Sequence, residues 1–278
     1  MAAIAKGPLP RAEAASVQRL LHERLSRRVA FDVWTLSPGT VVTPERDPGI
    51  HTDDVLALAR QLATLHPGLS VTPYDLERHA ERAHEEGITM VPATVLRSTG
   101  RSIQTVGYFS GALFQALLDL LWLISNGTSP VSPATRATLQ AIDTEVVMEA
   151  LVTPYDPFSV QLARLLGAFA MESKRIHVRI IEITEFRRLA EQRMVTEVPV
   201  LTINGRRSVG LWNESTLLEQ LQRILAGNEE PVVRDRIYTA PYISEEEARA
   251  LGSQPPPGTP PGTPPGRTAS GLILPGSP

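Results

Sequence analysis

The sequence of 278 residues contains no cysteine. Disulfide bonds, thiol catalysis, thiolate zinc sites and iron–sulfur ligation by this chain alone are therefore excluded. The six histidines are scattered and lack the HExxH pairing of a zinc hydrolase, so they predict no metal site. We expect these histidines to be surface or hydrogen-bonded residues, and we predict no cofactor.

The sequence also lacks a large excess of one charge sign and any long apolar run. The net charge is −3, with both signs interspersed, so the sequence offers no concentrated positive field for nucleic acid or an anionic membrane. The longest apolar stretch, residues 112–124, is interrupted by Gln115 and Asp119 and is too short to cross a bilayer. Residues 1–18 lack the apolar segment of a secretory signal peptide. We therefore predict a cytoplasmic protein with no membrane span and no nucleic-acid partner.

What is present is a repeated pattern of apolar segments and turns. The length of the chain and its 42% hydrophobic residues suffice for two domains. Helical spacing of apolar residues first predicts a helix over residues 17–25. The order β-α-β-α-β-β-α then occurs twice. In the first copy we predict strands at 29–36, 69–76, 91–96 and 103–109 and helices at 52–65, 77–86 and 112–124. In the second copy we predict strands at 145–152, 177–183, 198–201 and 208–211 and helices at 158–171, 186–194 and 214–225.

This order indicates an α/β fold of two tandem units, each with a central mixed sheet flanked by helices. We place the first domain at 16–128, with an enlarged loop at 37–50, and the second at 129–230. Residues 231–278 form a C-terminal extension.

The second unit has Thr153, Pro154, Tyr155 and Asp156 between its first strand and the helix that follows. This arrangement resembles the tandem thioredoxin-fold protein disulfide oxidoreductases, which are glutaredoxin-like and carry Cys-Pro-Tyr-Cys at that place. The resemblance covers about residues 16–228. A hydroxyl and a carboxylate form no reversible covalent link with a disulfide, so the attacking and the resolving thiol are both missing. The resemblance thus implies a degenerate member that has lost the redox cysteines.

The same resemblance assigns roles to two proline pairs. Val91-Pro92 and Val198-Pro199 match the family's cis-proline, which faces the active-site loop and offers a backbone edge to extended substrates. Simple strand entry with a trans bond is the alternative. We predict cis bonds and a peptide-binding surface at both pairs.

Other residues in these loops have a structural and a functional interpretation. Asp156 precedes Pro157, which favours a helix N-cap over an acid or base in catalysis. Tyr155 is expected to be an exposed loop residue, or else an anchor for a bound peptide. Thr52 is expected to cap a helix whose first turn holds Asp53 and Asp54, and this explains the run that begins at His51 better than a metal site does.

The C-terminal extension ends in a spacer rich in Pro, Gly and Thr, a composition that cannot form a core. Leu272, Ile273 and Leu274 follow this spacer as a short apolar element. They are predicted to dock on another surface, and a disordered end without a role is the alternative.

These observations favour a non-catalytic protein-binding adaptor, chaperone or scaffold with an unidentified protein partner. One alternative is a cargo or subunit recruited to a larger assembly through the tail. Another, by analogy of fold, is a maturation chaperone of a cofactor-bearing oxidoreductase such as a hydrogenase. A third class is an enzyme that uses glutathione or a partner's thiol, although nothing in the sequence supplies its nucleophile.

Overall fold

The computed structural model describes residues 7–37, 49–228, 230–234 and 236–252. Most of the loop predicted at 37–50 lies outside these ranges, as do Leu272, Ile273 and Leu274. The N-terminal half of the fold comprises α1 (Arg11–Arg24), β1 (Val29–Thr35), α2 (Thr52–Leu65), β2 (Leu69–Asp75), α3 (Ala80–Glu85), β3 (Ala93–Ser98), β4 (Arg101–Val106) and α4 (Gly111–Asn126). The C-terminal half comprises α5 (Pro133–Gln140), β5 (Val146–Val152), α6 (Pro157–Glu172), β6 (Ile176–Glu182), the 3₁₀ helix η1 (Ile183–Glu185), α7 (Arg187–Gln192), β7 (Glu197–Val198), β8 (Val200–Ile203), β9 (Arg206–Val209) and α8 (Glu214–Leu225). Two further elements, β10 (Ala240–Pro241) and α9 (Glu245–Gly252), follow α8.

Both halves repeat one strand arrangement. In the described part of the chain the main sheet has the order β2-β1-β3-β4-β6-β5-β8-β9. In each half the first two strands are parallel and the last two are antiparallel. The crossover helices α2 and α6 make the parallel pairs possible, because parallel neighbours need a long connection. The duplicated order predicted from the sequence is thus present within one continuous sheet.

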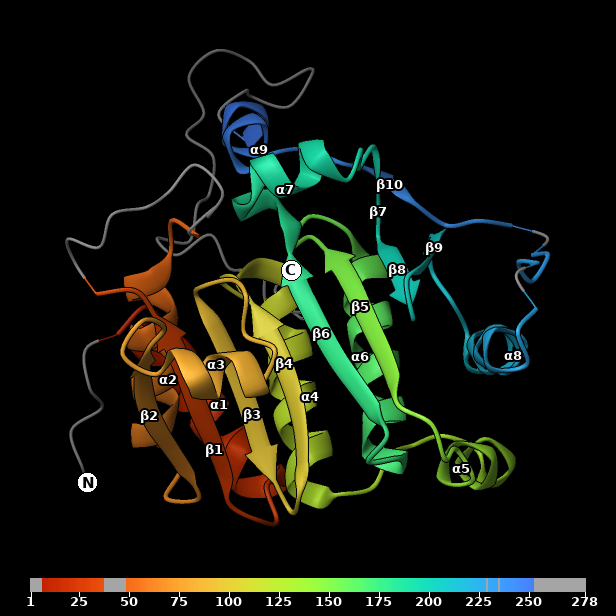
Figure 1. The fold of residues 1–278 in the computed structure, drawn as a ribbon. Coiled ribbons are helices and arrows are strands. Elements are labelled where there is room, and N and C mark those ends of the chain that lie inside the picture. The colour runs from red at the N-terminus through yellow and green to blue at the C-terminus, as the bar shows by residue number, and fades with distance from the viewer. Residues whose placement is uncertain (1–6, 38–48, 229, 235, 253–278) are drawn as a thin grey trace.

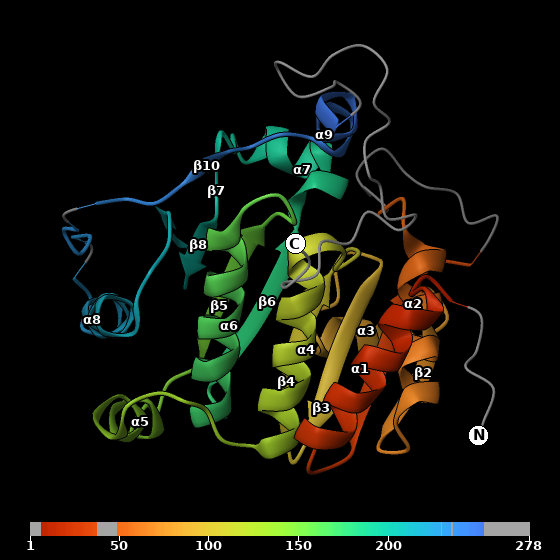
Figure 2. The same cartoon turned by 180° about the vertical axis from the view of Figure 1, so that it is seen from behind.

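The two halves meet where β4 pairs with β6. This pairing is parallel and runs from Gln104, opposite Arg179, to Val106, opposite Ile181. Behind it α4 packs against α6 (Figure 2). A Cβ added to Gly167 of α6 would clash with Leu120 of α4, so the glycine allows the close approach of the two helices.

Helices cover both faces of the sheet, and each face has its own hydrophobic core. Helices α1, α2, α4 and α6 bury one face, where the core includes Phe31 and Phe169 (Figure 2). The shorter helices α3 and α7 lie on the other face, where Trp34 and Phe186 are fully buried (Figure 1). Because apolar residues are needed on both sides, β1 is buried along most of its length.

Several local predictions were wrong; for example, α1 begins at Arg11 rather than at residue 17, and β9 ends at Val209 rather than at residue 211. Two other differences have a clear physical cause. Helix α3 begins at Ala80 rather than at residue 77, because the carboxylate of Asp75 accepts hydrogen bonds from the amides of Glu77 and Arg78 and holds them in a turn. Thr52 does not cap α2, since it is already the first helical residue and its hydroxyl donates to the carbonyl of Gly49 at 3.3 Å.

The region after α8 was not predicted to contain regular structure. Its described residues nevertheless form β10, which pairs with β7, and α9, which lies beyond α7 in Figure 1. Across the described ranges no helix is both long and apolar enough to pass through a membrane.

Candidate functional site

The loop of residues 153–156 connects β5 to α6, as the sequence predicts. Asp156 is buried and is the N-cap of α6: its Oδ1 accepts from the amide of Ser159 at 2.9 Å and its Oδ2 from the Ser159 hydroxyl at 2.6 Å. Pro157 follows at the start of the helix, where the missing N–H costs no hydrogen bond. The predicted cap is confirmed, and the carboxylate is engaged in holding the helix.

Thr153, the first residue of the loop, is also buried and engaged. Its amide donates to the hydroxyl of Ser159 at 3.0 Å, and its own hydroxyl accepts from the amide of Tyr155 at 3.3 Å. The next loop residue, Pro154, packs closely on the start of α4, since a Cβ added to Gly111 would lie only 3.3 Å from the Cβ of Pro154. The two loop ends therefore carry oxygen atoms that are used in local hydrogen bonds, and neither can act as a redox group.

Tyr155 lies at the tip of the loop and is 47% exposed, as expected for a loop aromatic. Partial burial raises the pKa of its hydroxyl, and the negative charges of Glu182 and Glu245 raise it further. A role for Tyr155 as a peptide anchor stays a prediction.

The peptide bonds before Pro92 and Pro199 are both cis, as predicted. The carbonyl of Pro92 accepts from the amide of Gly107 at 2.8 Å, and the carbonyl of Pro199 accepts from the amide of Gly210 at 2.8 Å. The two halves thus build the same backbone contact beside each proline. A peptide-binding role for Val91, Pro92, Val198 and Pro199 stays a prediction.

In the N-terminal half the edge beside Pro92 is already filled. The amide of Gly49 donates to the carbonyl of Val91 at 2.8 Å. A Cβ at Gly49 would come within 2.5 Å of Pro92 Cδ and within 2.7 Å of the Glu185 carboxylate, so only glycine fits this position. The chain itself therefore occupies the backbone edge at Val91.

In the C-terminal half the edge beside Pro199 is filled by residues 238–242, which we call the strap. Ala240 pairs antiparallel with Val198, and the amide of Tyr242 donates to the carbonyl of Thr196 at 2.9 Å. At the other end, the carbonyl of Tyr238 accepts from the amide of Leu211 at 3.0 Å. The sequence did not predict this contact.

Glu182, the last residue of β6, and Glu185, the last residue of η1, form a buried acidic pair next to these loops. Burial, followed by the charge of Glu185, raises the pKa of Glu182 to about 8, although Glu182 accepts hydrogen bonds from Thr184 and from the Glu185 amide. Burial also raises the pKa of Glu185 to about 7, and the Tyr108 amide and His51 offset this only in part. In the sequence Glu182 and Glu185 alternate with Ile183 and Phe186, so no local pattern marked them as a pair.

His51 joins this acidic region to the C-terminal segment. Its Nδ1 lies 2.9 Å from the carboxylate of Asp54, and its Nε2 lies 3.0 Å from that of Glu245 in α9. Burial lowers the pKa of His51, but these hydrogen bonds and the charges of Glu185 and Glu245 outweigh it, so the pKa is raised. No group of three or more His, Asp or Glu residues within the described ranges is arranged to hold a metal ion.

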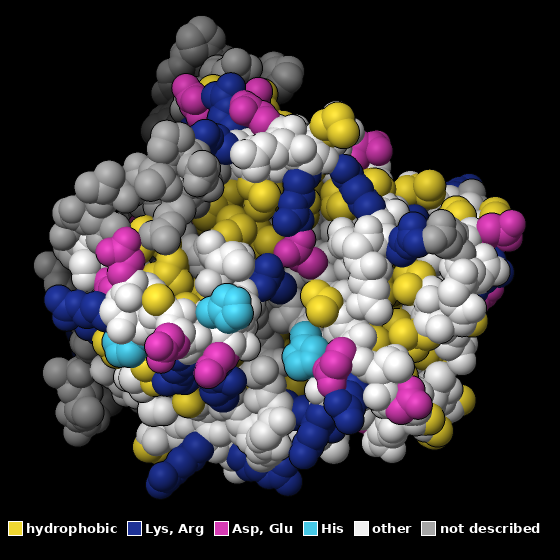
Figure 3. All heavy atoms as spheres, viewed as in Figure 1, with side chains coloured by type: hydrophobic (Ala, Val, Ile, Leu, Met, Phe, Trp, Pro, Cys, Tyr) yellow, Lys and Arg dark blue, Asp and Glu magenta, His cyan; other side chains and the backbone are white. Residues whose placement is uncertain are grey.

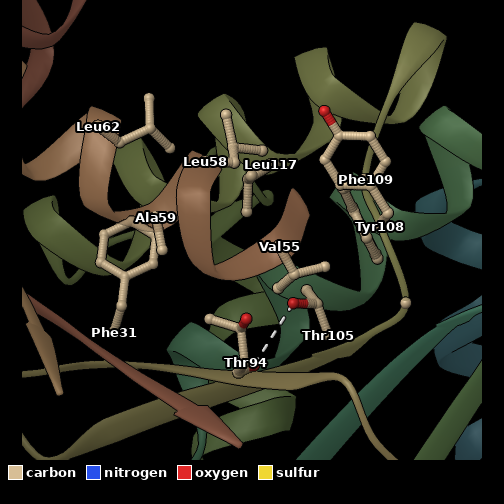
Figure 4. Close-up of a pocket in the computed structure, with 11 residues that line it drawn as sticks. Phe31, Val55, Leu58, Ala59, Leu62, Thr94, Thr105, Tyr108, Phe109 and Leu117 are labelled. Atoms are coloured by element: carbon tan, nitrogen blue, oxygen red, sulfur yellow. Dashed lines mark hydrogen bonds between the residues drawn. The ribbon is translucent and has the colours of Figure 1, made fainter. Parts of the chain in front are cut away.

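Between α2, α4 and the sheet lies a small apolar cavity of about 20 Å³ (Figure 4). Its polar wall is formed by Thr94 and Thr105, which are joined by a hydrogen bond of 3.4 Å from the Thr105 hydroxyl to the Thr94 carbonyl. The aliphatic residues Val55, Leu58 and Leu117 form much of the remainder. This volume accommodates at most one water molecule, so the cavity is a gap in the core rather than a substrate site.

Comparison with known proteins finds no matching family model and no matching curated protein. Solved structures do match. A protein disulfide oxidoreductase from Aeropyrum pernix K1 has a TM-score of 0.69 and 20% identity, over 82% of this chain and 97% of that one. The NTD_N/C domain of alkylhydroperoxide reductase AhpF from Enterococcus faecalis has a TM-score of 0.66 and 15% identity, over 77% of this chain and 99% of that domain. At these identities the likeness establishes the fold alone, and the chain is a cysteine-free protein with a thioredoxin-like fold.

Proposed function

We propose that this chain is a non-catalytic protein of thioredoxin-like fold that binds other proteins as an adaptor, chaperone or scaffold. The observation that carries the proposal is the state of the loop at residues 153–156. Thr153 and Asp156 stand where the disulfide oxidoreductases that the sequence resembles have thiols. The Thr153 hydroxyl accepts from the Tyr155 amide, and the Asp156 carboxylate accepts from the amide and the hydroxyl of Ser159. The frame of the fold is kept while its reactive groups are replaced by structural ones.

Protein binding is favoured over a new small-molecule chemistry by what surrounds this loop. The neighbouring backbone edge at β7 accepts an extended segment, which is how sheet edges recognise peptides. Hydrophobic side chains gather at the surface beneath α9, with basic and acidic side chains beside them (Figure 3). A surface of this kind suits contact with another polypeptide.

The alternative of an enzyme that uses glutathione or a partner's thiol requires a positioned nucleophile or base. Among the carboxylates of the described ranges, Glu182 and Glu185 have the most strongly raised pKa values, and Glu182 accepts hydrogen bonds from Thr184 and from the Glu185 amide. Both side chains are almost fully buried, which keeps them from direct contact with a substrate.

The first test is chemical. The full-length chain is expected to reduce insulin disulfides with dithiothreitol, or to oxidise a dithiol peptide, no faster than buffer, with or without added glutathione. Turnover above the uncatalysed rate would contradict the non-catalytic assignment.

The second test is for binding. The tagged full-length chain is used to capture proteins from its native host, and each captured protein is then purified and mixed with the chain alone. A non-covalent complex that survives gel filtration and reducing agent is expected. If none of the captured proteins binds the purified chain directly, the binding function is wrong.

A further inference from the structure

The strap follows the path that a bound peptide would take across the C-terminal half. The ring of Tyr238 packs against that of Phe158, in the first turn of α6, with 5.8 Å between ring centroids. Ala240 then lies opposite Val198, and the Thr239 hydroxyl donates to the Glu197 carboxylate at 3.0 Å. The strap thus bridges the first turn of α6, directly after the loop of residues 153–156, and the strand edge that precedes Pro199.

The register shows how the backbone of the strap is held. Tyr242 donates to Thr196, and Ala240 is the next residue on the same side of the ladder, so both occupy hydrogen-bonded positions. Pro241, opposite Glu197, lies at the intervening position that makes no ladder hydrogen bond. A proline is tolerated there, and its missing N–H leaves the outer side of the strap without a donor for a further strand.

The strap makes an imperfect occupant of this edge. The hydroxyl of Tyr242 is buried and has no hydrogen-bond partner in the described part of the chain. Burial, together with the charges of Glu182 and Glu247, raises the pKa of this hydroxyl to about 12. An unsatisfied buried hydroxyl is destabilising, so a segment with a better-matched side chain at this point would bind more tightly.

The charges around Tyr242 indicate which side chain is better matched. From the body of the protein, the neighbouring charged residues are Glu182, Glu191 and Arg187, two acids and one base. Glu185 lies next to Glu182 and contributes to its environment. Arg187 is paired with Glu191 at 2.9 Å, and Glu182 has no basic partner in the described part of the chain. A Lys or Arg side chain next to Glu182 would favour its charged form and form a charge-assisted hydrogen bond with it, which a tyrosine hydroxyl cannot do.

We propose that the edge at residues 196–198 is a binding site for an extended segment of a partner protein that carries Lys or Arg in the place of Tyr242, and that the strap occupies this edge until the partner displaces it. This proposal rests on the proposed protein-binding function and names its site and ligand class. The strap belongs to the same chain as the edge it covers, so it competes with any external segment at a high effective concentration. Only a segment that matches the edge better than the strap does can displace it.

The first test locks and frees the strap in the full-length chain. Glu197 and Pro241 face each other at a position without ladder hydrogen bonds, where Cα atoms lie about 4.5 Å apart, within the range that a disulfide spans. Because the chain has no other cysteine, the double variant Glu197→Cys/Pro241→Cys forms only this bond. Ala240→Pro removes a ladder donor and releases the strap, and Pro241→Ala, outside the ladder, is its matched control.

The probe is a fluorescent peptide that copies residues 236–243 with Tyr242→Lys, and binding is followed by anisotropy. We expect the Ala240→Pro chain to bind it at least about tenfold more tightly than the wild type, since tethered competition is removed. Pro241→Ala should behave as the wild type. The oxidised double variant should bind no peptide and should regain wild-type binding after reduction, which also shows that it is folded.

Peptide controls test the register and the charge. The same peptide with Ala240→Pro should not bind, because a ladder donor is lost. The peptide that keeps Tyr242 should bind several-fold more weakly than the Lys peptide, and 0.5 M salt should narrow that difference. Equal binding to locked and freed chains, or no binding to the freed chain, would overturn the proposed site, and tighter binding of the Tyr peptide would overturn the basic ligand.

Failure of this proposal can be distinguished from failure of the proposed function. A partner obtained by capture is presented to the oxidised and the reduced double variant. If it binds both equally, the chain is a binding protein but the edge is not its site. If no partner binds directly while the peptide binds only the freed chain, the protein-binding function fails and the strap acts solely as an internal closure of the edge.

Discussion

The Nε2 atom of His51 lies 3.0 Å from the carboxylate of Glu245, so the N-terminus of α2 and the first residue of α9 are joined across 194 positions of sequence. Through this contact the C-terminal segment, which already pairs with β7, is also fixed to the N-terminal half of the fold. Both side chains are largely buried, at 21% and 16% exposed. The contact therefore makes the position of α9 sensitive to the charge of one imidazole.

The first prediction concerns the docking of α9 as a function of pH. The pKa of His51 is raised above 6.5 in the folded protein, so the ion pair contributes its full stability below pH 6.5 and loses it as the pH rises through the folded value. We expect amide protection in α9, corrected for intrinsic exchange, to fall a few-fold between about pH 6 and pH 8.5. His51→Gln should remove this dependence. Glu246→Gln, at an exposed position of α9, should retain it, and a flat wild-type profile would contradict the prediction.

The second prediction concerns Glu185. Its pKa is about 7 when folded and 4.5 ordinarily, so the folded protein retains a proton that the unfolded chain has released. Global stability should therefore fall as the pH rises from 4.5 to about 7, by on the order of 2–3 kcal/mol from this group. Glu185→Gln keeps an acceptor for the amide of Tyr108 and should flatten the slope in urea unfolding curves measured at pH 5 and pH 8. Glu185→Ala loses that acceptor and should be destabilised at both values.

The parts of the structure that the sequence predicted are those governed by local chemistry. Asp156-Pro157 begins α6 because a side-chain acceptor and a proline satisfy the first turn within four residues. The alternation of strand and helix patterns likewise predicted the duplicated order of elements along the chain. Thr52 is not a cap, because its hydroxyl donates to the carbonyl of Gly49. No local sequence pattern indicated this hydrogen bond.

The parts that could not be predicted depend on contacts between distant residues. The strap has no apolar alternation, and its strand is only two residues long, so it gives no strand signal. The strap takes its conformation from pairing with β7, and this pairing needs the second half of the fold to be in place. The environment of Glu182 and Glu185 is likewise created by loops from both halves, so their raised pKa values had no sequence signature.

The third prediction separates the structural from the chemical role of Asp156. Asp156→Ala removes the acceptor for both the amide and the hydroxyl of Ser159 and should destabilise the protein by about 1–2 kcal/mol in urea unfolding. Asp156→Asn retains one acceptor oxygen and should recover much of this loss. Neither variant should change the background rate in the insulin assay. Equal stability of the Ala and Asn variants would show that the carboxylate is not needed as a cap.

The last prediction concerns Gly210, which lies under the strap. Its φ of +93° favours glycine, and a Cβ there would lie 2.7 Å from Ile237 and 3.1 Å from the carbonyl of Tyr238. Gly205 has a similar φ of +82° and no atom within 4 Å of the same added Cβ. Both Ala variants incur a backbone cost of roughly 1 kcal/mol, but only Gly210→Ala also pushes the strap away from its edge. We therefore expect similar losses of global stability and a selective loss of amide protection at residues 240 and 242 in Gly210→Ala, measured by hydrogen exchange. Equal protection of the strap in the two variants would show that it does not depend on the close approach at Gly210.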